Sequence, residues 1–70
     1  MHPVERAEQL RKRRGVTMTH IARHCGHTVT WYRDIALRRR RVYLDDFIKI
    51  AEALDEDVRS FFTPSIERNA

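Results

Sequence analysis

Four side chains that could bind a metal ion or attack a substrate lie close together in the sequence: His20, His24, Cys25 and His27. His20 and His24 are one helical turn apart, a workable spacing for two zinc ligands. However, Cys25 falls on the inward side of its predicted helix, and a buried thiol is usually inert. A chain of 70 residues offers little room for a substrate pocket, and it has no glycine-rich phosphate loop. We therefore expect no metal, no cofactor and no enzyme activity.

Arginine is the other chemically informative residue type, and it is unevenly distributed. Residues 1–41 contain eleven lysines and arginines against three acidic residues, which gives a net charge of +8, whereas residues 42–70 have a net charge of −4. The basic residues gather in runs at 11–14 and 38–41. This asymmetry indicates a polyanionic partner for the first part of the chain and a different partner, such as a second subunit, for the rest. The alternative is a solvated surface whose charge happens to be lopsided.

The length and composition indicate one small domain with a modest core. No run approaches the roughly 20 apolar residues that span a membrane, and charged residues directly after the start exclude the apolar core of a signal peptide. A single cysteine excludes an intramolecular disulfide and fits a reducing cytoplasm. We expect a folded body over residues 1–64 and a disordered tail over residues 65–70.

The spacing of apolar residues predicts an all-α fold with five helices, over residues 3–14, 18–25, 29–37, 44–54 and 58–62. Thr17 and Thr28 are suited to cap the second and third helices, and Gly15 and Gly26 to end the first and second. The stripe predicted to face the core in the fourth helix is formed by Leu44, Phe47, Ile48, Ala51 and Leu54. Ile50 lies off this stripe and is expected to be partly exposed.

The order and apolar positions of these helices resemble the lambda-repressor-like (Cro-type, XRE) helix-turn-helix family over about residues 6–62. The small Ala22, the turn residue Gly26 and the apolar Tyr32 and Ile35 match the family's second and third helices. The segment F-I-K-I-A-E-A-L at 47–54 resembles its fourth helix, and V-R-S-F-F its fifth. The resemblance implies a compact five-helix domain with a helix-turn-helix at helices two and three.

The sequence departs from the family pattern at several of these positions. The family often has a Glu-x-Gly segment after the third helix and a proline a few residues on, where this chain has Ala36, Arg38 and Val42. Met18 replaces a polar residue that commonly helps to hold a phosphate. Trp31 is unusual beside Tyr32, and two interpretations of it stay open: packing against the scaffold, or contact with the sugar-phosphate backbone.

In such proteins the third helix enters the major groove, where each base pair has its own pattern of donors and acceptors. Arg33 is the first candidate for a base contact, because a guanidinium can bridge guanine O6 and N7. Asp34 either accepts from cytosine or forms an ion pair on the helix surface with Arg38. The residues predicted to read bases are Thr28, Val29, Thr30, Arg33 and Asp34.

The arginine run after the third helix is expected to lie along the phosphate backbone and to supply affinity that does not depend on sequence. The residues predicted to contact the backbone are Thr17, Thr19, Arg23, Leu37, Arg38, Arg39, Arg40 and Arg41. For the run at 11–14 two interpretations are equally open: further phosphate contacts, or basic residues that complement the dipole of the first helix.

We expect a small bacterial or phage transcriptional repressor that acts by occupying a palindromic operator on double-stranded DNA as a homodimer. The residues predicted to form the dimer interface are Ile50, Phe61, Phe62 and Ile66, unless the phenylalanines simply close the core. The alternatives are an antitoxin that binds a partner protein and regulates its own gene, and an RNA-binding regulator.

Overall fold

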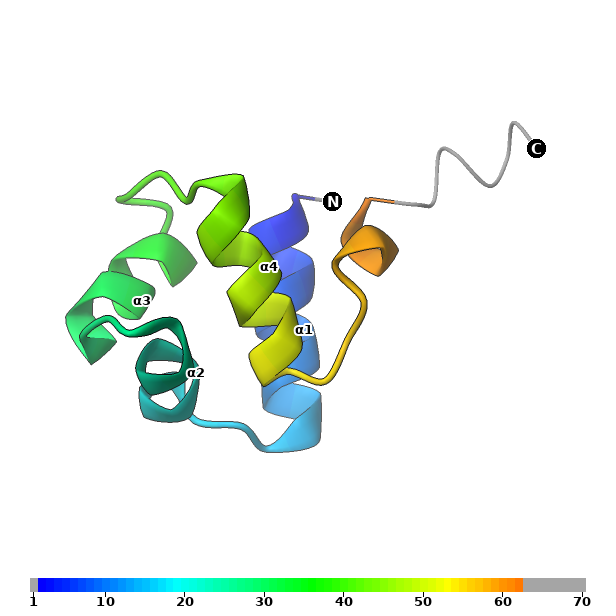
Figure 1. Ribbon diagram of the computed structural model, residues 1–70, viewed down its shortest axis with the longest axis horizontal. Helices are drawn as coiled ribbons and strands as arrows, with labels where there is room; N and C mark the ends of the chain where they lie inside the picture. Colours follow the sequence, from blue (N-terminus) through cyan, green and yellow to red (C-terminus); the bar gives the residue numbers. More distant parts are fainter. Residues whose placement is uncertain (1, 63–70) are drawn as a thin grey trace.

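The chain folds as a compact all-helical body in a computed structural model that describes residues 2–62. This part contains four α-helices, namely α1 (Pro3–Arg14), α2 (Met18–Cys25), α3 (Val29–Ala36) and α4 (Leu44–Ala53), followed by a short 3-10 helix, η1 (Val58–Phe61). Helix α2 packs against both α3 and α4, while α3 and η1 contact α1 from opposite sides (Figure 1). None of the helices within residues 2–62 is long and apolar enough to cross a membrane.

The predicted caps, Thr17 and Thr28, begin the second and third helices, α2 and α3. The hydroxyl of Thr17 accepts from the His20 backbone N–H at 3.0 Å, and that of Thr28 accepts from the Trp31 N–H at 3.2 Å. At the start of α1, Pro3 occupies the first turn, and the His2 ring nitrogen accepts from the Val4 N–H at 3.1 Å. Both α1 and α2 have the bounds expected from the sequence, because a capping residue marks each start and a glycine each end.

All four α-helices are followed by a residue with positive φ, and only two of these residues are glycine. They are Gly15, Gly26, Arg38 and Asp55, with φ between 57° and 76°. After each of them, the next N–H donates back to a carbonyl in the last turn of the helix, as His27 does to Ala22 at 2.9 Å. This is the Schellman arrangement, in which the left-handed position favours glycine.

Replacing Gly26 with alanine is expected to lower the free energy of unfolding by about 1 kcal/mol, because an L side chain disfavours the left-handed region. The effect is purely conformational, since a Cβ at Gly26 would meet nothing within 4 Å. Thermal unfolding followed by circular dichroism should show a midpoint lower by roughly 4–8 °C. The reverse change, Asp55→Gly, is expected to raise the midpoint. Equal midpoints for wild type and Gly26→Ala would contradict this account.

The core is formed by apolar residues from all five helices, and its largest fully buried side chains are Tyr32, Ile21, Ile35, Ile50 and Leu54. In α2 the buried residues are Ile21, Ala22 and Cys25, which confirms the inward position predicted for Cys25. Ala22 is small enough to let α3 approach α2 closely.

The prediction of which face of α4 is buried is wrong in part. Phe47, Ala51 and Leu54 are buried as expected, but Leu44 is 62% exposed and Ile48 is 37% exposed. Ile50, expected at the surface, is only 1% exposed. The helix has apolar residues on more than half of its circumference, so two overlapping stripes fit the same periodicity. Packing against α2 and η1 selects the stripe that contains Ile50.

The predicted fifth helix, over residues 58–62, is a short 3-10 helix over Val58–Phe61 rather than a further α-helix. Asp57 caps it as expected, and its carboxylate accepts from the Arg59 N–H at 2.9 Å. Short segments commonly adopt 3-10 geometry. The ranges predicted for α3 and α4 each extend one residue beyond the observed end of the helix. Ile66 and the tail over residues 65–70 lie outside the described residues.

Candidate nucleic-acid interface

Helices α2 and α3 form a closely packed pair joined by a short turn at Gly26. One side of α3 is buried through Trp31, Tyr32 and Ile35. The 3.6-residue period of a helix therefore turns Thr30, Arg33 and Leu37 away from the core, and all three are exposed. Thr28 is also exposed, whereas Val29 and Asp34 are half-buried and lie at the edges of this face.

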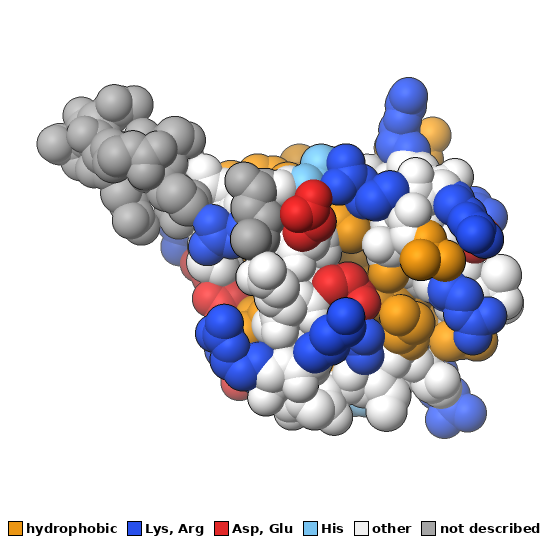
Figure 2. All heavy atoms as spheres, turned by 180° about the vertical axis from the view of Figure 1, so that it is seen from behind, with side chains coloured by type: hydrophobic (Ala, Val, Ile, Leu, Met, Phe, Trp, Pro, Cys, Tyr) orange, Lys and Arg blue, Asp and Glu red, His pale blue; other side chains and the backbone are white. Residues whose placement is uncertain are grey.

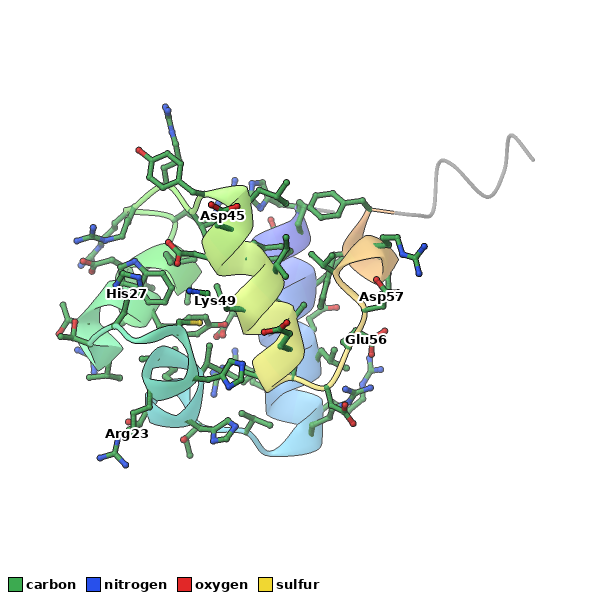
Figure 3. All side chains as sticks on the ribbon, in the orientation of Figure 1. Arg23, His27, Asp45, Lys49, Glu56 and Asp57 are labelled. Atoms are coloured by element: carbon green, nitrogen blue, oxygen red, sulfur yellow. The ribbon has the colours of Figure 1, made fainter. Side chains whose placement is uncertain are left out.

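Arg33 presents a charged guanidinium group on the outward face of α3. Its guanidinium has no ion-pair partner among residues 2–62, so its five donors are available to a ligand. Arg23 on α2 is exposed as well and points away from the body of the protein (Figure 3). The backbone candidates Thr17 and Thr19 are exposed at the start of α2, although the Thr17 hydroxyl already caps that helix.

The loop after α3 contains the run Arg38, Arg39, Arg40 and Arg41, and all four side chains are exposed. With His2, Val4, Ile35 and Val42 they line a hollow of about 340 Å³. Viewed from behind, basic side chains dominate the edge of the molecule that carries α3 and this loop, whereas over α1 basic and acidic side chains alternate (Figure 2). A concave, arginine-lined surface beside an exposed helix face is suited to bind phosphate groups.

Two of the four loop arginines are engaged within the protein. Arg38 donates to the Glu5 carboxylate at 3.2 Å, and Arg40 lies 3.9 Å from the carboxylate of Asp34. The predicted ion pair between Asp34 and Arg38 is therefore wrong. Arg38 turns toward α1 because its backbone is in the left-handed region, with φ of 64°. The pair between Glu5 and Arg38 joins residues far apart in sequence, and nothing in the local spacing signals it.

The basic run at the end of α1 serves the fold at two of its positions. Arg11 binds Glu8 through two hydrogen bonds of 2.7 and 3.0 Å and donates to the Val16 carbonyl at 2.9 Å. Arg14 donates to the Leu54 carbonyl and to Glu56, at 3.0 Å for the carboxylate. These two guanidinium groups are therefore occupied inside the chain, whereas Lys12 and Arg13 are exposed.

A half-buried polar network behind α3 fixes its angle against α1. The Tyr32 hydroxyl donates to Glu8 at 2.7 Å, and the same carboxylate receives the two bonds from Arg11. Burial opposes ionisation of Glu8, but the hydrogen bonds from Arg11 and Tyr32 outweigh it and hold the pKa of this carboxyl below its usual value. Burial and the Glu8 carboxylate together raise the pKa of Tyr32. Sequence reasoning missed this network, although the i, i+3 spacing of Glu8 and Arg11 is a signal that could have revealed their ion pair.

Trp31 packs within the scaffold, as one of its two interpretations predicted. It is 8% exposed and stacks on the His27 ring, with centroids 3.9 Å apart and planes inclined by 11°. The other side of this contact is tied to α4, because His27 Nε2 lies 3.4 Å from the Asp46 carboxylate. The indole is therefore a brace between the turn, α3 and α4.

The histidines and the cysteine of α2 do not assemble a metal or nucleophilic site within residues 2–62. His24 faces Glu52 at 3.5 Å, and no group of three or more potential ligands occurs in this part of the chain. Cys25 is buried. Burial, with a smaller contribution from Asp46, raises its pKa to about 11, so the thiol stays protonated at neutral pH.

Two of the residues predicted to form a dimer interface are part of the core. Ile50 is 1% exposed and Phe61 is 5% exposed, so neither is available to a second chain. Phe62 is 43% exposed and remains a candidate.

Comparisons of the chain with protein-family models, with curated proteins and with solved structures gave no match.

Proposed function

We propose that the chain is a sequence-specific regulator of transcription that binds double-stranded DNA, with α2 and α3 as a helix-turn-helix in a lambda-repressor-like fold. The observation that carries this proposal is the outward face of α3, where Arg33, which has no ion-pair partner within residues 2–62, stands beside a loop of four consecutive arginines. The ion pair between Asp34 and Arg40 joins the edge of that face to the loop. A helix that reads bases and a basic loop that contacts phosphates need this adjacency.

In the proposed complex α3 lies in the major groove and presents Thr30, Arg33 and Leu37 to the DNA. The fork of Arg33 matches the two acceptors of guanine, while the methyl groups of Val29 and Thr30 fit against thymine methyls. The start of α2, with Thr17 and Thr19, approaches a phosphate through its free backbone N–H groups. Bound at an operator, such a small protein acts as a repressor by excluding polymerase.

Selection of bound sites from a pool of random duplexes tests this function most directly. The expected result is enrichment of one half-site, repeated with two-fold symmetry at a spacing of about one helical turn. Random duplex DNA and single-stranded RNA serve as competitors in a gel shift with the enriched site. An enriched pool without a common motif, or equal competition by RNA, would overturn the proposal.

We further propose that the protein binds as a homodimer through the apolar surface at the start of α4, which includes Phe62 from the residues first predicted. Phe62 packs edge-on against Phe47, with centroids 5.8 Å apart, and lines a hollow of about 290 Å³. Tyr43 and Leu44 are 70% and 62% exposed at the same end of α4. A two-fold axis through this apolar end brings the same residues of a second copy together.

Replacing Leu44 and Phe62 with serine is expected to weaken self-association about tenfold or more, because each change removes an apolar anchor from the interface. Sedimentation of wild type and variant over a range of concentrations measures the effect. A matched change of an exposed apolar residue at the end of α3, Leu37→Ser, should leave the dissociation constant unchanged. A wild-type protein that stays monomeric at high micromolar concentration, both free and on DNA, would exclude the homodimer.

A further inference from the structure

We propose that the carboxylates of Glu5 and Asp34 compete with DNA phosphates for arginines of the loop, and that this competition lowers the sequence-independent affinity of the loop for DNA. This inference rests on the proposed DNA binding. The two carboxylates occupy Arg38 and Arg40 in the free protein. Arg39 and Arg41, the alternating members of the run, have no ion-pair partner within residues 2–62.

The pair formed by Glu5 and Arg38 is built so that a phosphate can displace it. Both side chains are about half exposed, at 56% and 46%, so the pair is solvated on one side and open to an anion. Exposed ion pairs of this kind contribute little to stability and exchange readily. The positive φ of Arg38 directs the guanidinium toward the first turn of α1, beside the hollow that the loop encloses. A phosphate entering this hollow must compete with the carboxylate.

Asp34 performs the same role from the edge of the reading helix. Its side chain is 27% exposed and lies 3.9 Å from Arg40, which is 51% exposed. A duplex that docks on α3 brings phosphates close to this carboxylate, and the like charges repel. Transfer of Arg38 and Arg40 from carboxylates to phosphates leaves two unpaired acids at the interface, and each lowers the affinity for any sequence. Binding then depends more strongly on base contacts such as the one proposed for Arg33.

Neutralising Glu5 is expected to tighten binding to a random duplex by about two- to fivefold at physiological salt, the range that corresponds to an exposed ion pair. The same change should steepen the plot of log affinity against log salt by up to about 0.9, because one further arginine is free to neutralise a phosphate. Fluorescence anisotropy with a labelled random duplex measures both quantities for Glu5→Gln and Asp34→Asn. The matched control is Glu52→Gln. Glu52 lies on α4 and faces His24 of α2, and this change removes the same charge from a different part of the surface.

A double-mutant cycle separates competition from a general change of charge. Arg38→Gln should cost little affinity in the wild type, where Arg38 must first leave Glu5, and several-fold more in the Glu5→Gln background. Equal effects of Glu5→Gln and Glu52→Gln would overturn the inference while leaving the DNA-binding function intact. Weaker binding by Glu5→Gln would also overturn it, because the pair would then be positioning the loop. If the wild type shows no salt-dependent binding to any duplex, the proposed function fails and the inference fails with it.

Discussion

Replacing Glu8 with alanine is expected to lower the free energy of unfolding by about 2–3 kcal/mol, because it breaks a half-buried network and strands its partners. The Glu8 and Arg11 side chains are only 14% and 13% exposed, and the Tyr32 hydroxyl has the Glu8 carboxylate as its partner. Without Glu8, the phenol loses its acceptor and the guanidinium loses two of its hydrogen bonds, although it keeps the bond to the Val16 carbonyl, in a site that water reaches poorly. A domain of 70 residues has about 4–10 kcal/mol of total stability, so this loss is severe.

Urea unfolding followed by circular dichroism measures this effect, with Glu52→Ala as the control. Glu52 is also a glutamate in a helix, but its side chain is 61% exposed and its partner is the His24 ring at 3.5 Å. The control is expected to change the unfolding free energy by less than about 0.5 kcal/mol. Similar losses for the two variants would show that the network behind α3 has no special role.

The same network makes part of the stability dependent on pH. The pKa of Glu8 is lower in the folded protein than its ordinary value of 4.5, so its ionised form favours folding. Its contribution is fully present above pH 4.5 and is lost as the pH falls through the lower folded value. The difference in unfolding free energy between wild type and Glu8→Gln should therefore shrink as the pH falls from 7 to 3. A difference that stays constant over this range would contradict the assignment.

The parts of the fold that follow from local rules could be predicted from the sequence. Thr17, Thr28 and Gly26 fix the ends of helices through side-chain oxygens and a permitted backbone conformation, and both effects act within a few residues. The face of α4 could not be predicted in the same way. Its apolar residues fit two stripes, and only contacts with distant helices decide that Ile50 is buried and Leu44 is exposed.

The electrostatics of the candidate site depend on pairs that are distant in sequence. Glu5 meets Arg38 across 33 positions, and Glu8 meets Tyr32 across 24. None of these four residues indicates its partner when it is taken alone. The exposure of Arg33 and of the arginine run could be anticipated, because it requires only helical periodicity and a loop that follows it. Which arginines are free to bind a ligand could not, since that depends on how α1 packs beside α3.

Replacing Arg33 with alanine is expected to reduce discrimination between the selected half-site and a random duplex by about 1–3 kcal/mol, or roughly 5- to 150-fold. The reason is that a bidentate guanidinium distinguishes guanine from the other bases, and alanine reads none of them. Arg33 has no internal partner within residues 2–62, so its removal disturbs no ion pair of the fold. Competition gel shifts with single-base variants of the half-site locate the position at which specificity is lost.

The matched control is Arg39→Ala, since Arg39 is also an exposed arginine without an ion-pair partner in the described part of the chain, but is located in the loop rather than on α3. It is expected to weaken binding to all duplexes alike and to reduce the salt slope by about 0.9, because a phosphate contact carries no sequence information. The two variants thus separate the recognition of bases from binding to the phosphate backbone. If Arg33→Ala weakens every sequence equally and leaves the site preference unchanged, Arg33 contacts the backbone, and base reading must be assigned to Thr30 and its neighbours on α3.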